Sequence, residues 1–336
     1  MRKTAWVAAL AITLAACMGS AGTDATDTAD ITDTTDTTVA STGATTETTS
    51  APTTVVVAET EFPVTVSASN GEVTIEERPE TIVSISPSGT EMLFAVGAGD
   101  QVAAVDEYSY FPAEAPVTDL SGFTPNVEAI AAYDPDLVVL SDDIDGLVGA
   151  LTGLGIPTLQ LAGFEVTSLD DVYRQIETVG IATGHARQAA ETTADMRAEV
   201  ESLLAGIDQA DTGLTYYHEL DSTFYTVTST TFIGYLYSLF GLENIADPAD
   251  ADGQAFGYPQ LSEEFIIEAD PDFIFITDCC GDTAATVAER PGWSGLSAVR
   301  SQSVVVFDTD VSSRWGPRIV EFLRGISRAI DEKNPT

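Results

Sequence analysis

A fifteen-residue pattern occurs twice in this chain, starting at Asn126 and again 136 residues later at Ser262. The first copy spans residues 126–140 (NVEAIAAYDPDLVVL), and the second spans residues 262–276 (SEEFIIEADPDFIFI). Each copy has a helix-capping residue, a glutamate two positions later, an apolar run, Asp-Pro-Asp and a strongly apolar segment. Because Asn and Ser are favoured N-caps and the residue before proline avoids the helical region, we expect a short helix and then a buried strand. Two such units this far apart predict two similar α/β lobes with a ligand site between them.

Strand-length apolar segments alternate with helical segments along the chain, which indicates mostly parallel sheets. Strands are expected at residues 81–86, 101–105, 137–140, 157–161, 215–218, 273–277 and 304–307. Helices are expected at residues 90–96, at 317–330 and from Ser168 to about Asp208, the last with a break at Thr183 and Gly184. The predicted organisation is an N-terminal α/β lobe at residues 61–167, a connecting helix at 168–210 and a C-terminal α/β lobe at 211–336.

The N-terminus is typical of a secretory signal. Arg2 and Lys3 precede an apolar run over residues 5–16 that is shorter than a membrane-spanning helix. The run ends in Leu-Ala-Ala-Cys and resembles the lipobox of bacterial lipoproteins, which implies a signal peptide at residues 1–16 and acylation of Cys17. Ordinary secretion with an incidental Cys17 is the alternative. Residues 17–60, mostly Thr, Asp, Ala and Ser, predict a disordered tether behind the lipidated Cys17.

The charge of the chain argues against a nucleic-acid partner. It has 53 acidic and 13 basic residues, a formal net charge of −40. A phosphate backbone would be repelled by such a protein.

Several segments resemble the substrate-binding proteins of ABC importers for ferric siderophores, haem and cobalamin. They are the repeated pair and residues 81–100, 224–246, 258–264 and 290–318, so the resemblance covers nearly everything after about residue 62. It implies two Rossmann-like lobes with mostly parallel sheets, a long connecting helix, a shallow cleft and little hinge closure. It also implies a lipid-anchored extracytoplasmic protein, without intrinsic cofactor or catalysis, that hands a metal chelate to an ABC permease and its ATPase. We expect a monomer.

Glu128 and Glu264 match the glutamates, one per lobe, that dock onto arginines of the permease in this family. Two equivalent carboxylates suit a two-fold symmetric partner. The alternative is that each glutamate only complements its helix dipole.

The ligand is expected at the loops that follow the strands, because ligands of open α/β sheets lie beyond the carboxyl ends of the strands. Aromatic side chains are dense in these loops and suit a large, flat or partly apolar chelate. The predicted ligand-binding residues are Pro87, Ser88, Tyr108, Tyr110, Phe123, His218, Phe232, Tyr258, Asp310, Arg314 and Trp315.

Asp310 and Arg314 align with polar residues that contact the ligand in cobalamin-binding members of the family. Arg314 suits a carboxylate, phosphate or catecholate group, and the alternative is a structural salt bridge with a nearby acid. Where the cobalamin-binding members have aromatic residues after the aspartate, this chain has Val311 and Ser312, although its residues 108–112 (YSYFP) are similar to theirs. Both a ferric siderophore and a corrinoid such as cobalamin are therefore predicted ligands, with a slight preference for the siderophore.

Cys279 and Cys280 are adjacent and are the only cysteines besides Cys17. Outside the cytoplasm they are candidates for a vicinal disulfide that stiffens the cleft wall. With Cα atoms about 3.8 Å apart such a ring would be strained. Two free thiols are the alternative.

Other functions remain open. Haem is another ligand of the same fold, and a bare Zn or Mn ion is a further one, although a single cleft histidine disfavours a site for a bare ion. We therefore expect no protein-bound metal. A secreted hydrolase built on Ser88, His218 and Asp221 is a distant alternative, because no motif orders these residues as nucleophile and base.

Overall fold

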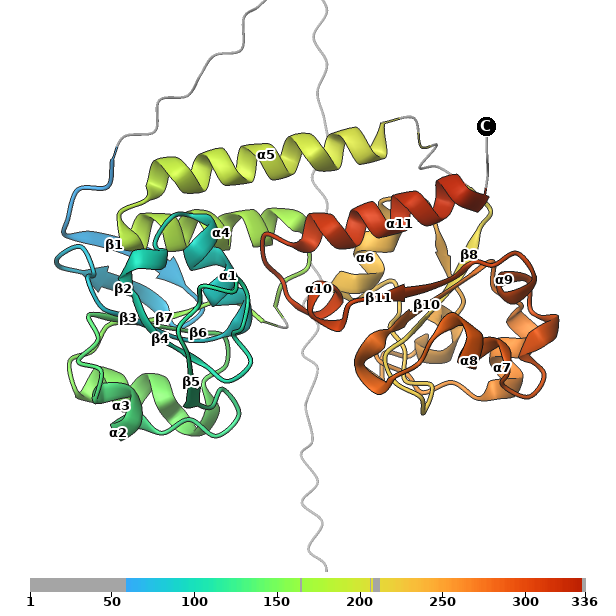
Figure 1. The fold of residues 1–336 in the computed structure, drawn as a ribbon, viewed down its shortest axis with the longest axis horizontal. Helices are drawn as coiled ribbons and strands as arrows, with labels where there is room; N and C mark the ends of the chain where they lie inside the picture. The colour runs from blue at the N-terminus through green and yellow to red at the C-terminus, as the bar shows by residue number, and fades with distance from the viewer. Residues whose placement is uncertain (1–58, 164, 206, 208–211, 334–336) are drawn as a thin grey trace, which may run out of the picture. The chain divides into compact units, whose positions relative to one another are not determined.

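The computed structural model describes residues 59–163, 165–205, 207 and 212–333 of the chain, and its fold is drawn in Figure 1. The predicted signal peptide, Cys17 and nearly all of the predicted tether lie outside the described residues. None of the helices within the described ranges combines the length and the apolar character needed to cross a membrane.

Two parallel sheets form the centres of two α/β lobes (Figure 1). The N-terminal sheet has the order β5 (Val117–Leu120), β4 (Val102–Asp106), β3 (Ile82–Ile85), β6 (Leu137–Leu140) and β7 (Thr158–Gln160). The C-terminal sheet has the order β11 (Val304–Phe307), β10 (Phe273–Thr277), β8 (Thr215–Glu219) and β9 (Glu243–Asn244). A separate antiparallel hairpin, β1 (Val64–Ala68) with β2 (Gly71–Ile75), precedes both sheets along the chain. The predicted α/β class with mostly parallel sheets is confirmed.

Helices cover the sheets. They are α1 (Pro87–Ala95), α2 (Val127–Ala131), α3 (Leu147–Gly153), α4 (Leu169–Thr183), α5 (Ala186–Leu204), α6 (Phe232–Ser238), α7 (Glu263–Ala269), α8 (Ala284–Ala288), α9 (Ser297–Arg300), α10 (Thr309–Ser313) and α11 (Ile319–Lys333). The central strands β3 and β6 are buried along their whole length, as expected for parallel strands covered on both faces.

The repeated sequence pattern folds as the same unit in each lobe. Asn126 caps α2 by accepting a hydrogen bond from the amide of Ala129 (3.0 Å), and Ser262 caps α7 by accepting one from Phe265 (3.2 Å). Helix then gives way to β6 and β10 at the predicted points.

The Asp-Pro-Asp step explains why the repeat recurs. Its first residue, Asp134 or Asp270, takes a left-handed conformation, with φ of 51° and 43°. Its second aspartate holds the start of the neighbouring strand. The Asp136 carboxylate accepts the amide hydrogen of Thr81 (2.9 Å), and that of Asp272 accepts the amide hydrogen of Thr215 (3.1 Å). Each copy therefore ends a helix, starts a strand and fixes that strand to its neighbour in the sheet, which is β3 for β6 and β8 for β10.

The segment predicted as a connecting helix folds as two helices. Gly184, with φ of 83°, ends α4, and the chain turns into α5, which packs along α4 (Figure 1). The break noted in the sequence is thus the turn of a helical hairpin. α4 contacts α1 and β1 of the N-terminal lobe, and α5 contacts α11 of the C-terminal lobe.

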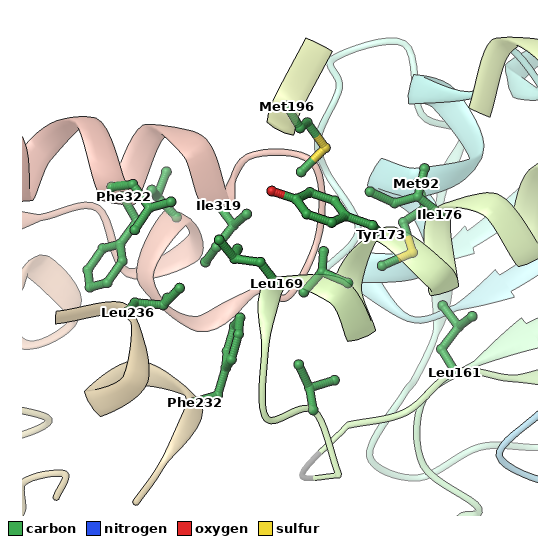
Figure 2. Packing of buried hydrophobic residues seen from close by; sticks show 14 of the residues in the cluster. Met92, Leu161, Leu169, Tyr173, Ile176, Met196, Phe232, Leu236, Ile319 and Phe322 are labelled. Atoms are coloured by element: carbon green, nitrogen blue, oxygen red, sulfur yellow. The ribbon is translucent and has the colours of Figure 1, made fainter. Parts of the chain in front are cut away.

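One apolar cluster continues from lobe to lobe beneath these helices. Figure 2 shows Tyr173 of α4 near Met196 of α5, with Leu169 and Ile319 between it and the aromatic side chains of the C-terminal lobe. A shared, close-packed core of this kind resists rotation of one lobe against the other.

Candidate functional site

A pocket of about 510 Å³ lies where the N-terminal lobe meets α10 and the two residues that follow it. Most of its walls come from segments at the carboxyl ends of β3, β4, β5, β6, β7 and β11, as expected for a parallel α/β sheet, and Gln175 of α4 completes them. Seven of the sequence-predicted residues line it, namely Pro87, Ser88, Tyr108, Phe123, Asp310, Arg314 and Trp315. The volume is within the range of small-molecule sites.

A second pocket of about 380 Å³ adjoins the first, because Trp315 lines both. It contains the predicted residues Phe232 and Tyr258, together with Phe256. Trp315 packs edge-on against Phe232, with ring centroids 4.9 Å apart. Tyr110 lines neither pocket, but its hydroxyl donates a hydrogen bond to Asp310 (2.5 Å).

The helix α1 starts at the pocket. Ser86 caps it by accepting a hydrogen bond from the amide of Gly89 (3.0 Å), and Pro87 supplies the first helical residue, where its missing N–H is harmless. The Ser86 hydroxyl also lies 2.6 Å from the hydroxyl of Ser141, which ties the start of α1 to the loop after β6. The positive end of the α1 dipole therefore contributes to the pocket wall.

Arg314 is paired in the way that the structural alternative anticipated. Only 7% of its side chain is exposed, and its guanidinium contacts Glu91 (3.1 Å) and Asp310 (2.7 Å). It also donates a hydrogen bond to the carbonyl of Tyr108 (3.1 Å). Glu91 is on α1, so this network joins the two lobes directly beside the pocket. Burial raises the pKa of Glu91, although Arg318 and Arg314 oppose that shift.

Asp106 is a site residue that the sequence reasoning missed. Its buried carboxylate accepts hydrogen bonds from the amide of Tyr108 (2.8 Å) and the hydroxyl of Ser109 (2.8 Å), and so positions Tyr108 at the pocket. Burial raises its pKa. One feature of the sequence could have identified Asp106. It is an aspartate at the end of a strand, two positions before an aromatic residue, and this spacing favours an Asx-turn.

Phe123 and Phe256 present large apolar surfaces at the two pockets, with 69% and 86% of each residue exposed. Phe123 packs edge-on against Tyr108 at 5.3 Å. Phe256 has a φ of 53°, a strained conformation for a non-glycine residue, and the Asp250 carboxylate fixes it by accepting the amide hydrogens of Ala255 and Gly257 (2.7 Å each). Such strain concentrates at ligand-binding loops.

His218 does not face a pocket, and the prediction that it binds the ligand is wrong. It has no exposed surface, and its Nδ1 lies 2.8 Å from the hydroxyl of Tyr237 in the core. His218 is not the last residue of β8, which continues to Glu219. Its imidazole packs against Tyr237 of α6 and Phe322 of α11, so these helices cover it. A parallel strand that is covered on both faces shows no alternation of apolar and polar residues, so the sequence of β8 did not indicate that His218 is buried.

The buried imidazole makes stability depend on pH. Burial lowers the pKa of His218 to about 4. In the unfolded chain the pKa of this histidine is near 6.5, so between pH 6.5 and 4 the unfolded state binds a proton that the folded state does not. The contribution of neutral His218 to the free energy of unfolding is therefore complete above pH 6.5 and is lost as the pH falls towards 4. Between pH 7 and 4, wild type is expected to lose about 3 kcal/mol more unfolding free energy than His218→Phe. Urea unfolding at a series of pH values measures this difference, and parallel curves for the two proteins would contradict it.

The profile of a family described as periplasmic binding protein matches residues 82–311, a range that contains both parallel sheets and the first residues of α10. The chain belongs to the periplasmic binding protein family. A cobalamin-binding protein of Halobacterium salinarum is 34% identical over 281 residues, which are 80% of this chain and 74% of the relative. The Bacillus subtilis protein named as an uncharacterized ABC transporter substrate-binding lipoprotein, YvrC, is 32% identical over 280 residues, 80% of this chain and 86% of YvrC.

Solved structures share the fold of this periplasmic binding protein. The periplasmic vitamin B12 binding protein BtuF of Vibrio cholerae superimposes with a TM-score of 0.63 at 24% identity, over 77% of this chain and 99% of BtuF. The two-lobed architecture inferred from the sequence is therefore confirmed.

Members of the periplasmic binding protein family bind ligands and are not enzymes. The residues of the hydrolase alternative are not brought together here, since Ser88 lines the pocket and His218 is enclosed in the core. Among the described residues, no group of three or more His, Cys, Asp or Glu side chains is placed to hold a metal ion.

The remaining predicted residues lie away from the two pockets. Glu128 and Glu264 are exposed in the first turns of α2 and α7, at equivalent places in the two lobes. Cys279 is exposed after β10, with its Sγ 3.9 Å from the carbonyl oxygen of Leu220. The side chain of Cys280 lies outside the described part of the structure, so the vicinal disulfide stays a prediction.

Proposed function

We propose that this protein captures a corrinoid of the cobalamin class in the cleft formed by the two pockets. In this proposal, acylated Cys17 anchors it outside the cytoplasm, and Glu128 and Glu264 dock it onto an ABC permease to deliver the ligand. The names of the Halobacterium and Bacillus relatives support the ligand, the transport role and the lipid anchor. An intact mass that includes acyl groups on the mature protein checks the anchor.

The choice of a corrinoid over the other ligands rests on the charge of the residues that line the larger pocket. Its charged lining residues are Asp106, Asp142, Asp310 and Arg314, and the arginine is already paired with Glu91 and Asp310. An anionic ferric catecholate or a haem with two propionates would meet carboxylates and no unpaired cation. A corrinoid suits the lining better, because a large ring edged with neutral amides needs aromatic contacts and hydrogen bonds rather than a counter-charge.

The sequence-based preference for a siderophore rested on Val311 and Ser312, which replace aromatic residues. Both are buried in α10 and neither lines the pocket, whereas Thr309, Asp310, Ser313, Arg314 and Trp315 do. The identity of these two residues therefore does not weigh against a corrinoid.

Calorimetric titration with cyanocobalamin, haem and one ferric hydroxamate and one ferric catecholate tests the ligand. We expect one molecule of cyanocobalamin per protein and at least tenfold weaker binding of each anionic chelate. Tighter binding of haem or of a ferric siderophore would overturn the choice of a corrinoid.

Trp315 is expected to be the main aromatic anchor, since it lines both pockets. Trp315→Ala should weaken corrinoid binding about 30- to 100-fold, which corresponds to about 2–3 kcal/mol for a central aromatic residue. The matched control is Tyr133→Ala, because Tyr133 is an exposed aromatic that lines neither pocket. Equal affinities of Trp315→Ala and wild type in the same titration would remove Trp315 from the site.

A further inference from the structure

Gln175 of α4 has a buried carboxamide that the fold does not use. Neither its Nε2 nor its Oε1 has a hydrogen-bond partner among the described residues, and both atoms are enclosed. Other amide side chains of the lobes are used. Asn70 bonds to Thr158 and Gln160, Gln101 donates to the carbonyls of Pro79 and Thr183, and Asn244 donates to Tyr216 and Val227. A buried amide without partners is costly, so its presence calls for a functional explanation.

Gln175 lies at the edge of the buried face of α4. Val172 and Val179, one turn before and after it, are completely buried, as is the adjacent Ile176, which Figure 2 shows within the apolar cluster. Asp171 and Thr178, the other two residues one turn away, are polar and half-buried. The residue therefore has an ordinary polar position in the sequence, and only the enclosure of its amide is unusual.

Gln175 is also part of the wall of the ligand pocket. It lines the 510 Å³ pocket together with Leu161 and Ala162, and the same three residues line a neighbouring cavity of about 390 Å³ beside β1 and α4. Gln175 therefore stands at the boundary between the pocket and this cavity. Its two polar atoms are enclosed, so in this structure they do not face the pocket that the residue lines together with Leu161 and Ala162.

We propose that Gln175 determines specificity by turning its enclosed carboxamide into the pocket when the ligand binds and pairing it with a primary amide at the edge of the ligand. This inference rests on the proposed corrinoid function, since corrinoid rings carry acetamide and propionamide side chains. Two carboxamides satisfy each other, because each supplies one N–H donor and one carbonyl acceptor. A ligand carboxylate at this place would satisfy only Nε2 and would repel Oε1. The residue thus selects amide over acid at one position of the ring edge.

The test compares wild type, Gln175→Met and Gln101→Met as full-length proteins. Methionine has a similar length and no hydrogen-bonding amide, so Gln175→Met should raise the thermal midpoint of the ligand-free protein by about 2–4 °C, because an unpaired buried amide is removed. The same variant should bind cyanocobalamin about tenfold more weakly, equivalent to about 1.4 kcal/mol. Gln101→Met is the matched control. It loses bonds inside the fold, so its midpoint should fall while its affinity stays at the wild-type value.

A second measurement separates specificity from packing. The probes are the cyanocobalamin monocarboxylic acids, in which a single propionamide is hydrolysed to a carboxylate. Wild type should bind one of these isomers about tenfold more weakly than cyanocobalamin, and Gln175→Met should reduce that ratio to about twofold. A variant with unchanged affinity and unchanged discrimination would overturn the inference while leaving corrinoid binding by wild type intact. If wild type itself does not bind cyanocobalamin, the proposed function and this inference are both overturned.

Discussion

Glu91→Ala is expected to lower the free energy of unfolding by about 3–5 kcal/mol, because the substitution leaves two arginines without their buried counter-charge. The Glu91 side chain is 1% exposed and pairs with Arg314 (3.1 Å) and Arg318 (3.4 Å). Burial raises the pKa of Glu91 despite these arginines, so desolvation of the carboxylate outweighs the attraction. Removal of one partner of a buried ion pair leaves the charge of the other partner buried and unpaired, which is why a large loss of stability is expected.

Urea unfolding at pH 7 measures this effect, with Glu321→Ala as the matched control. Glu321 pairs with the same Arg318 at 3.7 Å, but its side chain is 45% exposed, so its loss should cost at most about 1 kcal/mol. Similar small losses for the two variants would mean that the network joining α1 to the residues that follow α10 is not a structural connection between the lobes.

The double variant Glu128→Ala, Glu264→Ala is expected to reduce corrinoid uptake to background while its affinity for the ligand stays within about twofold of wild type. The two exposed carboxylates occupy equivalent first-turn positions of α2 and α7, one in each lobe, and neither lines a described pocket. Charged groups at the edge of an interface set orientation and association rate with a partner. Loss of both should therefore prevent docking and leave the cleft unchanged.

Uptake of labelled cyanocobalamin by cells that depend on this protein measures the transport effect, and calorimetry measures the binding. The control variant is Glu107→Ala, Glu268→Ala, which removes the same charge from exposed positions, one in each lobe. Uptake at the wild-type rate by the Glu128 and Glu264 variant would contradict the docking role. A loss of ligand affinity in that variant would contradict it as well.

The local sequence was sufficient where a structural unit is defined by neighbouring residues. The Asp-Pro-Asp step predicted where α2 and α7 end and where β6 and β10 begin, because proline, cap and strand lie within one short segment. Loops after strands were also predictable, since parallel sheets bring the carboxyl ends of their strands to one edge. Seven predicted residues consequently line the larger pocket.

The remaining features depend on contacts between distant residues. Glu91 and Arg314 are separated by 223 positions, and nothing in either local sequence identifies the other as its partner. Gln175 resembled an ordinary polar residue of an amphipathic helix until the packing of α4 showed its amide to be enclosed. His218 was misplaced because a strand covered on both faces gives no alternation from which to read the exposed side. The turn at Gly184 was visible, but only the packing of α5 along α4 distinguishes a hairpin from one bent helix.

The most direct test of corrinoid capture is a competition followed by native mass spectrometry. The protein, purified without refolding, is incubated with an equimolar mixture of cyanocobalamin, haem and ferric hydroxamate and catecholate siderophores, and the mass of the bound ligand is read from the intact complex. We expect one adduct per protein with the mass of cyanocobalamin, and we expect that adduct to be largely lost from a Trp315→Ala sample. An adduct with the mass of haem or of a ferric siderophore, or no adduct from any of the chelates, would contradict corrinoid capture.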